Sequence, residues 1–209
     1  MSSRRLLLLR HGRTAHNASR RFQGQLDIPL DDTGIAQATA AAQVLAPLRP
    51  AAIVSSDLVR AAATAAPLAA LTGRAVTEDP RLREIALGTW QGLSIAEASA
   101  QFPAELAAWR EGEDVRRGGG ETYYEVGERA VACVQEALAP LGDGELLIAV
   151  THGGTARAVI GTLIGIHHDR WSSLGPLANC RFSLLVEAGT RGWRLLMHNA
   201  ETPEAGGIH

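Results

Sequence analysis

The stretch RLLLLRHG, residues 5–12, decides the fold class of this chain. Its four consecutive leucines form a short apolar run, which is typical of a strand buried on both faces of a sheet. The other clear strand, predicted over residues 145–151, ends in the same way, with His152 and Gly153 directly after it. Ligands of open α/β sheets bind beyond the carboxyl ends of the strands. His11 and His152 are therefore predicted to stand where such a fold places its chemistry.

Strand-like and helix-period segments alternate along the rest of the chain. The sequence predicts further strands at 51–55 and 75–78, helices over 33–50, 56–73, 94–110, 122–138 and 153–164, and an antiparallel hairpin of 181–186 with 193–197. Thr33 and Ser56-Asp57 are the expected N-caps of the first two helices, and Phe102-Pro103 is expected to interrupt the third. Residues 201–209 are expected to fray. The alternation predicts a three-layer α/β/α domain with a mostly parallel central sheet.

Composition sets limits on function. The chain has 209 residues, 46% of them hydrophobic, which predicts one globular domain over residues 1–209. Its 20 basic and 22 acidic side chains leave a net charge of -2, so there is no electrostatic argument for nucleic acid or a membrane surface as partner. All 20 basic residues are arginines. The lack of lysine excludes Schiff-base catalysis and a P-loop phosphate site.

The cysteines, the remaining histidines and the apolar segments of the sequence do not indicate a disulfide framework, a metal site or a membrane span. Cys133 and Cys180 are too few for a disulfide framework or a four-thiolate zinc site. His16, His167 and His168 lack the ligand spacing of a metal site, so we expect no metal. The run of four leucines is too short for a secretory signal, and no segment approaches the ~20 apolar residues that span a bilayer. A cytoplasmic location is expected.

Arg10 and His11 together suggest phosphorus chemistry. A neutral imidazole can attack phosphorus, and a guanidinium can hold phosphoryl oxygens bidentately. The tripeptide alone is weak, because a histidine hydrogen-bonded within a turn explains it equally well. Three further residues strengthen the interpretation: Arg60 at a predicted helix N-terminus, Glu84 in an irregular segment with apolar flanks, and His152. The set supplies a nucleophile, a cationic cradle and one general acid.

The ordered motifs RHGRT (10–14), SSDLVRA (55–61), LRE (82–84) and THGG (151–154) resemble the histidine phosphatase superfamily, which also contains the cofactor-dependent phosphoglycerate mutases. The resemblance implies a phosphoglycerate mutase-like fold and a small phosphorylated substrate, with no metal or other cofactor. It implies that His11 becomes the phosphohistidine and that Glu84 is the proton donor. The residues it places around the phosphate are Arg10, Asn17, Gln23, Gly24, Arg60, His152 and Gly153.

The resemblance favours a phosphatase over a mutase. Leu93-Ser94 leads directly into a predicted helix, where mutases of the family carry an inserted arm. Residues 93–122 are expected to form a cap-like insertion. Segments 24–27, 54–58 and 87–93 resemble glucosyl-3-phosphoglycerate phosphatases of actinobacteria, which implies that compound, or a related phosphoglycerate or sugar phosphate, as substrate. A phosphoglycerate mutase and a non-catalytic phospholigand-binding protein are the alternatives.

Several residues have two interpretations. The following either contact the leaving group of the substrate or are ordinary surface residues: Arg13, Arg116, Arg117, Tyr123 and Tyr124. Packing rather than sugar binding is expected of three tryptophans: Trp109, Trp171 and Trp193. Trp90 is expected to brace the segment that holds Glu84. The Ala-rich helices at 34–48 and 61–70 favour close helix packing and are compatible with a homodimer face.

Overall fold

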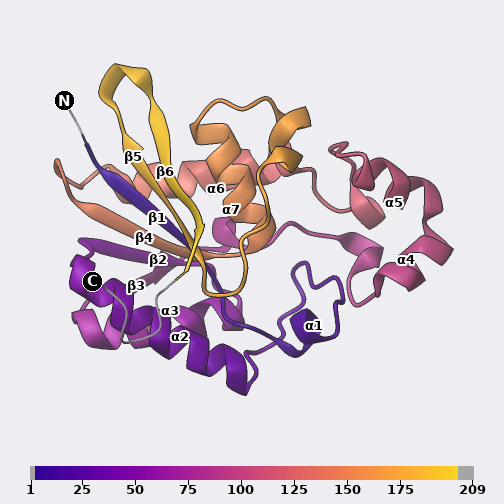
Figure 1. The fold of residues 1–209 in the computed structure, drawn as a ribbon, viewed down its shortest axis with the longest axis horizontal. Coiled ribbons are helices and arrows are strands. Elements are labelled where there is room, and N and C mark those ends of the chain that lie inside the picture. The colour runs from indigo at the N-terminus through magenta and orange to yellow at the C-terminus, as the bar shows by residue number, and fades with distance from the viewer. Residues whose placement is uncertain (1–2, 202–209) are drawn as a thin grey trace.

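A six-stranded mixed sheet forms the centre of the molecule. The computed structural model describes residues 3–201, apart from the side chain of His168 (Figure 1), so the fraying predicted beyond Glu201 lies outside the described residues. The strand order is β3-β2-β4-β1-β5-β6. Strands β1, β2, β3 and β4 run parallel to one another, β5 runs antiparallel to β1, and β6 runs antiparallel to β5. The strands are β1 (Arg5–Arg10), β2 (Ala52–Ser55), β3 (Val76–Glu78), β4 (Leu146–Thr151), β5 (Phe182–Glu187) and β6 (Trp193–Ala200). The predicted mostly parallel sheet with a C-terminal hairpin is confirmed.

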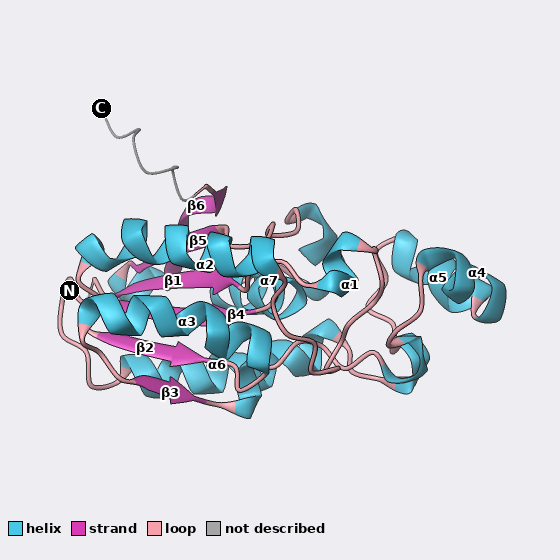
Figure 2. Cartoon of the chain, turned by 90° about the horizontal axis from the view of Figure 1, so that it is seen from below, coloured by secondary structure: helices cyan, strands magenta, loops and turns pink. Residues whose placement is uncertain are grey.

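Helices cover both faces of this sheet (Figure 2). On one face Leu7 and Leu9 pack against α2 (Asp32–Leu45) and α3 (Val59–Thr72). On the other, Leu6 and Leu8 pack against α6 (Tyr123–Leu138) and α7 (Gly153–Leu163). Successive side chains of a strand point to opposite faces, so the all-leucine β1 is apolar on both sides. This gives the predicted three layers.

Short helices extend beyond the carboxyl ends of the parallel strands. They are α1 (Ala15–Ala18), α4 (Ile95–Gln101) and α5 (Pro103–Arg110), and α4 and α5 lie at the end toward which the strand arrows of Figure 2 point. The break between α4 and α5 falls at Phe102, as predicted, because the residue before a proline avoids helical geometry. Short 3₁₀ segments occupy Ala46–Leu48, Pro80–Leu82, Gly88–Trp90, Arg117–Gly119, His168–Ser173 and Gly189–Arg191. Within residues 3–201, no helix combines the length and apolarity needed to cross a membrane.

Two predicted N-caps are wrong. The cap of α2 is Asp31, whose carboxylate accepts the N–H of Gly34 at 2.8 Å, so the helix begins before Thr33. At α3, Leu58 is the N-cap and makes no side-chain cap. Asp57 instead pairs with Arg83, while Asp27 accepts the Val59 N–H at 2.8 Å. The cap of α2 is thus local but two residues earlier than predicted, whereas at α3 the capping carboxylate comes from Asp27, distant in sequence.

The pairing of the strands determines where the site lies. Arg10 is paired with Thr151 across β1 and β4, and Ser55 with Val150 across β2 and β4. The first residue after each strand therefore falls at one edge of the sheet. His11, Ser56 and His152 are those residues.

Candidate active site

His11 and His152 lie side by side at the ends of β1 and β4. Their ring centroids are 5.1 Å apart, and both side chains are buried. A cavity of about 220 Å³ opens above His11. Its lining residues are Arg10, His11, Asn17, Arg21, Phe22, Gln23, Gly24, Arg60, Glu84, Ile85, Leu87, Trp109, Arg117, Tyr123 and Gly154.

One ring nitrogen of His11 is available for attack. Its Nδ1 lies 2.7 Å from the carbonyl oxygen of Gly12. A carbonyl only accepts, so Nδ1 carries the proton and Nε2 carries the lone pair. Burial, together with the charges of Arg10 and Arg60, lowers the pKa of His11 well below the ordinary value of 6.5. The imidazole is therefore neutral at physiological pH, as a nucleophile must be.

Arg60 is a buried cation and Arg10 a half-buried one, and both are held by carbonyl oxygens rather than by carboxylates. Arg10 Nη1 donates to Leu177 at 2.5 Å, and Arg60 donates to Leu26 at 2.7 Å and Gly24 at 2.8 Å. Burial lowers the pKa of Arg10 and lowers that of Arg60 to about 10, so both stay protonated near neutral pH. Each Nε lacks a hydrogen-bond partner within the described chain. Neither guanidinium is hydrogen-bonded to a carboxylate within residues 3–201, which favours the binding of an anion between them.

Asn17 and Gln23 present amide N–H groups to the same cavity. Thr14 orients both, because its hydroxyl lies 3.1 Å from Asn17 Oδ1 and donates to Gln23 Oε1 at 2.9 Å. Asn179 also donates to Asn17 Oδ1, at 3.1 Å. With both amide oxygens engaged, their nitrogens are left without an acceptor among the residues described. Gly24 adjoins them with φ of +52°, and a Cβ there would lie 2.3 Å from Gln91 Oε1.

Glu84 reaches the cavity from the irregular segment after β3. Its carboxylate accepts the N–H groups of Gly154 at 3.1 Å and Thr155 at 3.0 Å, at the first turn of α7. A carboxylate is favoured at a helix N-terminus, both by the free N–H groups and by the dipole. Glu84 is therefore held between the cavity and α7, in reach of a leaving group bound above His11.

His152 and Gly153 lie beside the cavity, next to His11 and Arg10 respectively. Neither lines the cavity; His152 lies behind His11, with Nε2 2.8 Å from the hydroxyl oxygen of Ser56. Its Nδ1 is buried and has no partner in residues 3–201. Burial and the charge of Arg60 lower the pKa of His152 well below 6.5. It is Gly154 that reaches the cavity wall.

The family model for the histidine phosphatase superfamily, branch 1, matches residues 6–201. The chain belongs to this superfamily. A glucosyl-3-phosphoglycerate phosphatase of Mycolicibacterium vanbaalenii is 39% identical over 100% of both chains. A metal-independent phosphoserine phosphatase of Arabidopsis thaliana is 34% identical over 86% of this chain and 75% of its own. A mycobacterial glucosyl-3-phosphoglycerate phosphatase solved with VO3 is 40% identical, with a TM-score of 0.90 over 95% of this chain and 100% of that one.

These matches confirm the predicted histidine phosphatase fold and phosphatase class. The geometry also decides between the open interpretations of several residues. Arg13 turns away from the cavity, donating to Asp31 at 2.9 Å. Arg116 is exposed and paired with Glu125. Tyr124 is also exposed, with its hydroxyl 3.0 Å from Glu128. None of the three lines the cavity.

Arg117 and Tyr123 do line this histidine phosphatase cavity, and Trp109 joins them. Trp109 also makes edge contacts with Phe22 and Trp90, so its predicted packing role describes only part of its surroundings. Trp90 is fully buried and is not a lining residue, in agreement with its predicted bracing role. Trp171 is buried as predicted, and the half-buried Trp193 packs against the core.

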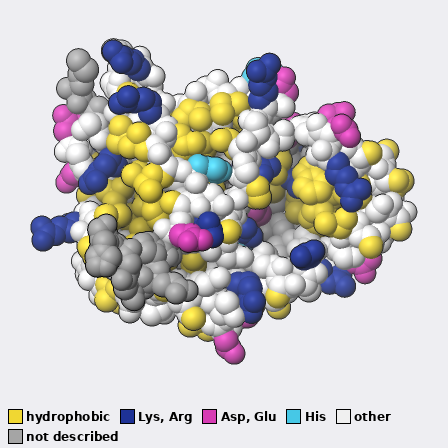
Figure 3. Space-filling model, viewed as in Figure 1, with side chains coloured by type: hydrophobic (Ala, Val, Ile, Leu, Met, Phe, Trp, Pro, Cys, Tyr) yellow, Lys and Arg dark blue, Asp and Glu magenta, His cyan; other side chains and the backbone are white. Residues whose placement is uncertain are grey.

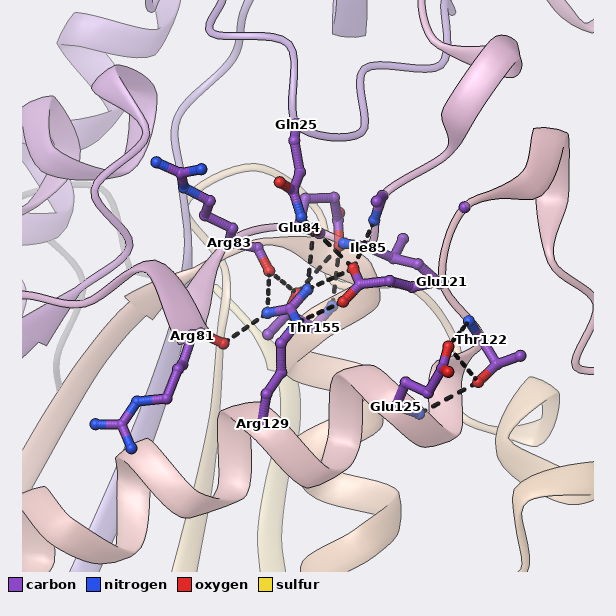
Figure 4. Close-up of polar contacts among 12 residues, drawn as sticks. Gln25, Arg81, Arg83, Glu84, Ile85, Glu121, Thr122, Glu125, Arg129 and Thr155 are labelled. Atoms are coloured by element: carbon purple, nitrogen blue, oxygen red, sulfur yellow. Dashed lines mark hydrogen bonds and ion pairs between the residues drawn. The ribbon is translucent and has the colours of Figure 1, made fainter.

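Sequence reasoning missed the network that holds Glu84 in place. From α6, the guanidinium of Arg129 donates to the carbonyl oxygens of Arg81, Arg83 and Glu84, and to the carboxylate of Glu121 (Figure 4). Gln25 donates to the same Glu84 carbonyl at 3.1 Å. One signal was present: Arg129 is a cation directly beside Ala130, on the apolar face of an amphipathic helix.

Within the described residues, no group of three or more metal-ligating side chains occurs.

Proposed function

We propose that this protein is a metal-independent phosphomonoesterase that works through phosphorylated His11. The observation that carries the proposal is the neutral His11 imidazole, with Nε2 unprotonated, beside Arg10 and Arg60, whose guanidinium groups have no hydrogen-bonded carboxylate in the described residues. Such a pocket attracts a phosphate group and presents a nucleophile to its phosphorus.

The proposed reaction has two steps. The substrate phosphate binds between Arg10 and Arg60, with the amides of Asn17 and Gln23 donating to its oxygens. His11 Nε2 forms a bond to phosphorus while the bond to the leaving oxygen breaks, and protonated Glu84 gives its proton to that oxygen. Water then attacks phosphorus and gives a proton to Glu84. The N–P bond breaks, its electron pair returns to Nε2, and phosphate leaves.

In this scheme His152 acts on the site through its position behind His11. Its Nδ1 has no hydrogen-bond partner within residues 3–201 and is therefore available to a phosphoryl oxygen that binds next to the His11 ring. The polarity of the Ser56–His152 pair also stabilises the phosphorylated state next to it. Residues 93–122 act as a cap, because Trp109 and Arg117 of this segment form part of the cavity wall.

We further infer that the substrate is glucosyl-3-phosphoglycerate or a related phosphoglycerate or sugar phosphate. The identity of 39% over the full length of a phosphatase with that name supports this assignment.

A phosphoglycerate mutase is disfavoured, since Ser94 caps α4 directly and no inserted arm precedes it. We propose a cytoplasmic homodimer. Of the Ala-rich helices α2 and α3, predicted to be compatible with a dimer face, the alanines Ala42, Ala61 and Ala65 are buried against the sheet. We therefore propose the hairpin of β5 and β6 as the dimer face, where apolar side chains gather (Figure 3) and Leu196 and Met197 are exposed.

The test is phosphate release from glucosyl-3-phosphoglycerate, 3-phosphoglycerate and 4-nitrophenyl phosphate in the presence of EDTA. His11→Ala is expected to lower turnover on every active substrate by a factor of ~10⁴ or more. His16→Ala, which removes a histidine of the same loop outside the cavity wall, serves as the matched control and keeps activity. Full activity of folded His11→Ala would refute the proposal. Conversion of 3- to 2-phosphoglycerate without phosphate release would identify a mutase.

A further inference from the structure

Arg117 is, besides Arg60, a second buried arginine in the cavity wall. It comes from the loop between α5 and α6, and only 4% of it is exposed. Its guanidinium carbon lies 5.4 Å from the ring centroid of Trp109 and 5.1 Å from that of Tyr123. The two rings hold the guanidinium through cation–π contacts. Arg117 is therefore fixed in place, unlike an ordinary surface arginine.

The charge of Arg117 has no counter-ion in residues 3–201. Its Nε and Nη2 are buried and have no hydrogen-bond acceptor within the described chain. Three carboxylates nearby in sequence are engaged elsewhere: Asp114 accepts the N–H groups of Tyr123 and Tyr124, Glu105 accepts the Gly118 N–H at 2.8 Å, and Glu121 binds Arg129. Aromatic rings offset only part of the cost of burying a charge. An anion supplied by a ligand would offset the rest.

The charges around the cavity leave Arg117 unused by the phosphate. Four arginines line the cavity, against the single carboxylate of Glu84. Arg21 is paired with Glu97, and Arg10 and Arg60 are assigned to the phosphate group. One positive charge remains, on the part of the wall formed by aromatic side chains. A substrate with a second negative charge, in its leaving group, matches this arrangement.

We propose that Arg117 is a specificity-determining residue that binds a carboxylate on the leaving group, so that the enzyme selects phosphate esters of hydroxy acids over those of neutral alcohols. The inference rests on the proposed phosphatase function. The planar end of the guanidinium, Nη1 with Nη2, offers two donors at the spacing of two carboxylate oxygens. Trp109 and Tyr123 keep that end oriented. Arg116, one residue earlier, is ion-paired with Glu125 and does not line the cavity, so it does not bind this carboxylate.

The experiment compares two substrates that differ at one carbon: 3-phosphoglycerate, with a carboxylate, and glycerol 3-phosphate, with a hydroxymethyl group. The wild-type enzyme is expected to have the higher kcat/KM on 3-phosphoglycerate. Arg117→Gln should lower the ratio of the two kcat/KM values by a factor on the order of 100. Arg117→Lys, which keeps the charge without the planar fork, should restore part of it. Arg116→Gln is the matched control and should leave the ratio as in wild type.

The ratio is measured on one protein at a time, so a loss of folded enzyme cancels. Equal losses on both substrates in Arg117→Gln, or a wild-type enzyme without preference for the carboxylate, would overturn the role of Arg117 and leave the phosphatase function standing. Activity of His11→Ala equal to wild type, or no phosphate release from any ester, would overturn the proposed function and this inference with it.

Discussion

Arg129 holds Glu84 by its main chain, while the Glu84 carboxylate lies between the cavity and the start of α7. The Nη2 of Arg129 donates to the Glu84 carbonyl oxygen at 3.1 Å, while the carboxylate is turned toward α7. The same guanidinium holds the carbonyls of Arg81 and Arg83. A single side chain on α6 therefore orders the irregular segment that carries the proposed acid.

Arg129→Met should destabilise the protein by about 2–4 kcal/mol, because it leaves several carbonyls and the half-buried Glu121 carboxylate without their donor. It should also lower kcat more than it raises KM, since Glu84 loses its position. Urea denaturation and steady-state kinetics measure the two effects. Arg81→Met, which removes an arginine that pairs with Glu136 at the surface, is the control and should change kcat little. Unchanged kcat in Arg129→Met would contradict the positioning role.

Glu84→Gln should show a dependence on the leaving group. An alkyl phosphate needs a proton on its departing oxygen, so we expect turnover to fall by about 10²–10⁴. The nitrophenolate leaving group is stable without a proton, so 4-nitrophenyl phosphate should be affected far less in the first step. Kinetics on 3-phosphoglycerate and 4-nitrophenyl phosphate provide the comparison. Parallel losses on the two substrates would argue against Glu84 as the acid.

Stability should decrease as the pH falls below about 6.5. Burial lowers the pKa of His11 and His152 in the folded protein, so the unfolded chain binds more protons as the pH falls through 6.5. Above that value both states are neutral and the contribution is constant. Each histidine contributes a limiting slope of about 1.4 kcal/mol per pH unit. The exposed carboxylates, such as Glu125 with a pKa of about 2, titrate at lower pH and do not mask this effect.

Urea denaturation at pH 7.5, 6.5 and 5.5 measures that slope. His11→Gln removes one of the two buried imidazoles and should reduce the slope between pH 6.5 and 5.5 by about half. A free energy of unfolding that is constant over this range would show that the two histidines are protonated equally in both states.

Gly34→Ala should destabilise the protein by about 2–3 kcal/mol and disturb the loop after His11. A Cβ at Gly34 would lie 2.0 Å from the carbonyl oxygen of Arg13, where backbone meets backbone and no side chain can yield. Gly175→Ala is the matched control, because a Cβ there meets no atom within 4 Å. Thermal unfolding and phosphate release compare the two. Equal midpoints would show that the contact of α2 with residues 12–13 relaxes easily.

The strands and the mostly parallel character of the sheet were predictable from local patterns. The leucines of β1 and the apolar run of β4 form buried strands in any parallel arrangement, because only such a sheet covers both of their faces. The place of His11 and His152 follows from strand ends alone, since parallel strands bring their carboxyl ends to one edge. The family motifs then indicated Arg10, Arg60 and Glu84, all of which line the cavity.

What the sequence determined by itself was thus the alternation of buried strands and helices, and with it the edge where the two histidines meet. Tertiary structure alone decided which of two adjacent arginines faces the cavity. Arg116 and Arg117 are adjacent in the sequence. Arg116 forms an ion pair with Glu125, whereas Arg117 makes cation–π contacts with the rings of Trp109 and Tyr123. The same holds for Asp57, which binds Arg83 instead of capping its own helix. A long charged side chain can reach several partners, and the tertiary packing decides which of them lies within reach. Apolar runs are buried because the hydrophobic effect removes them from water, and this depends mainly on the local sequence.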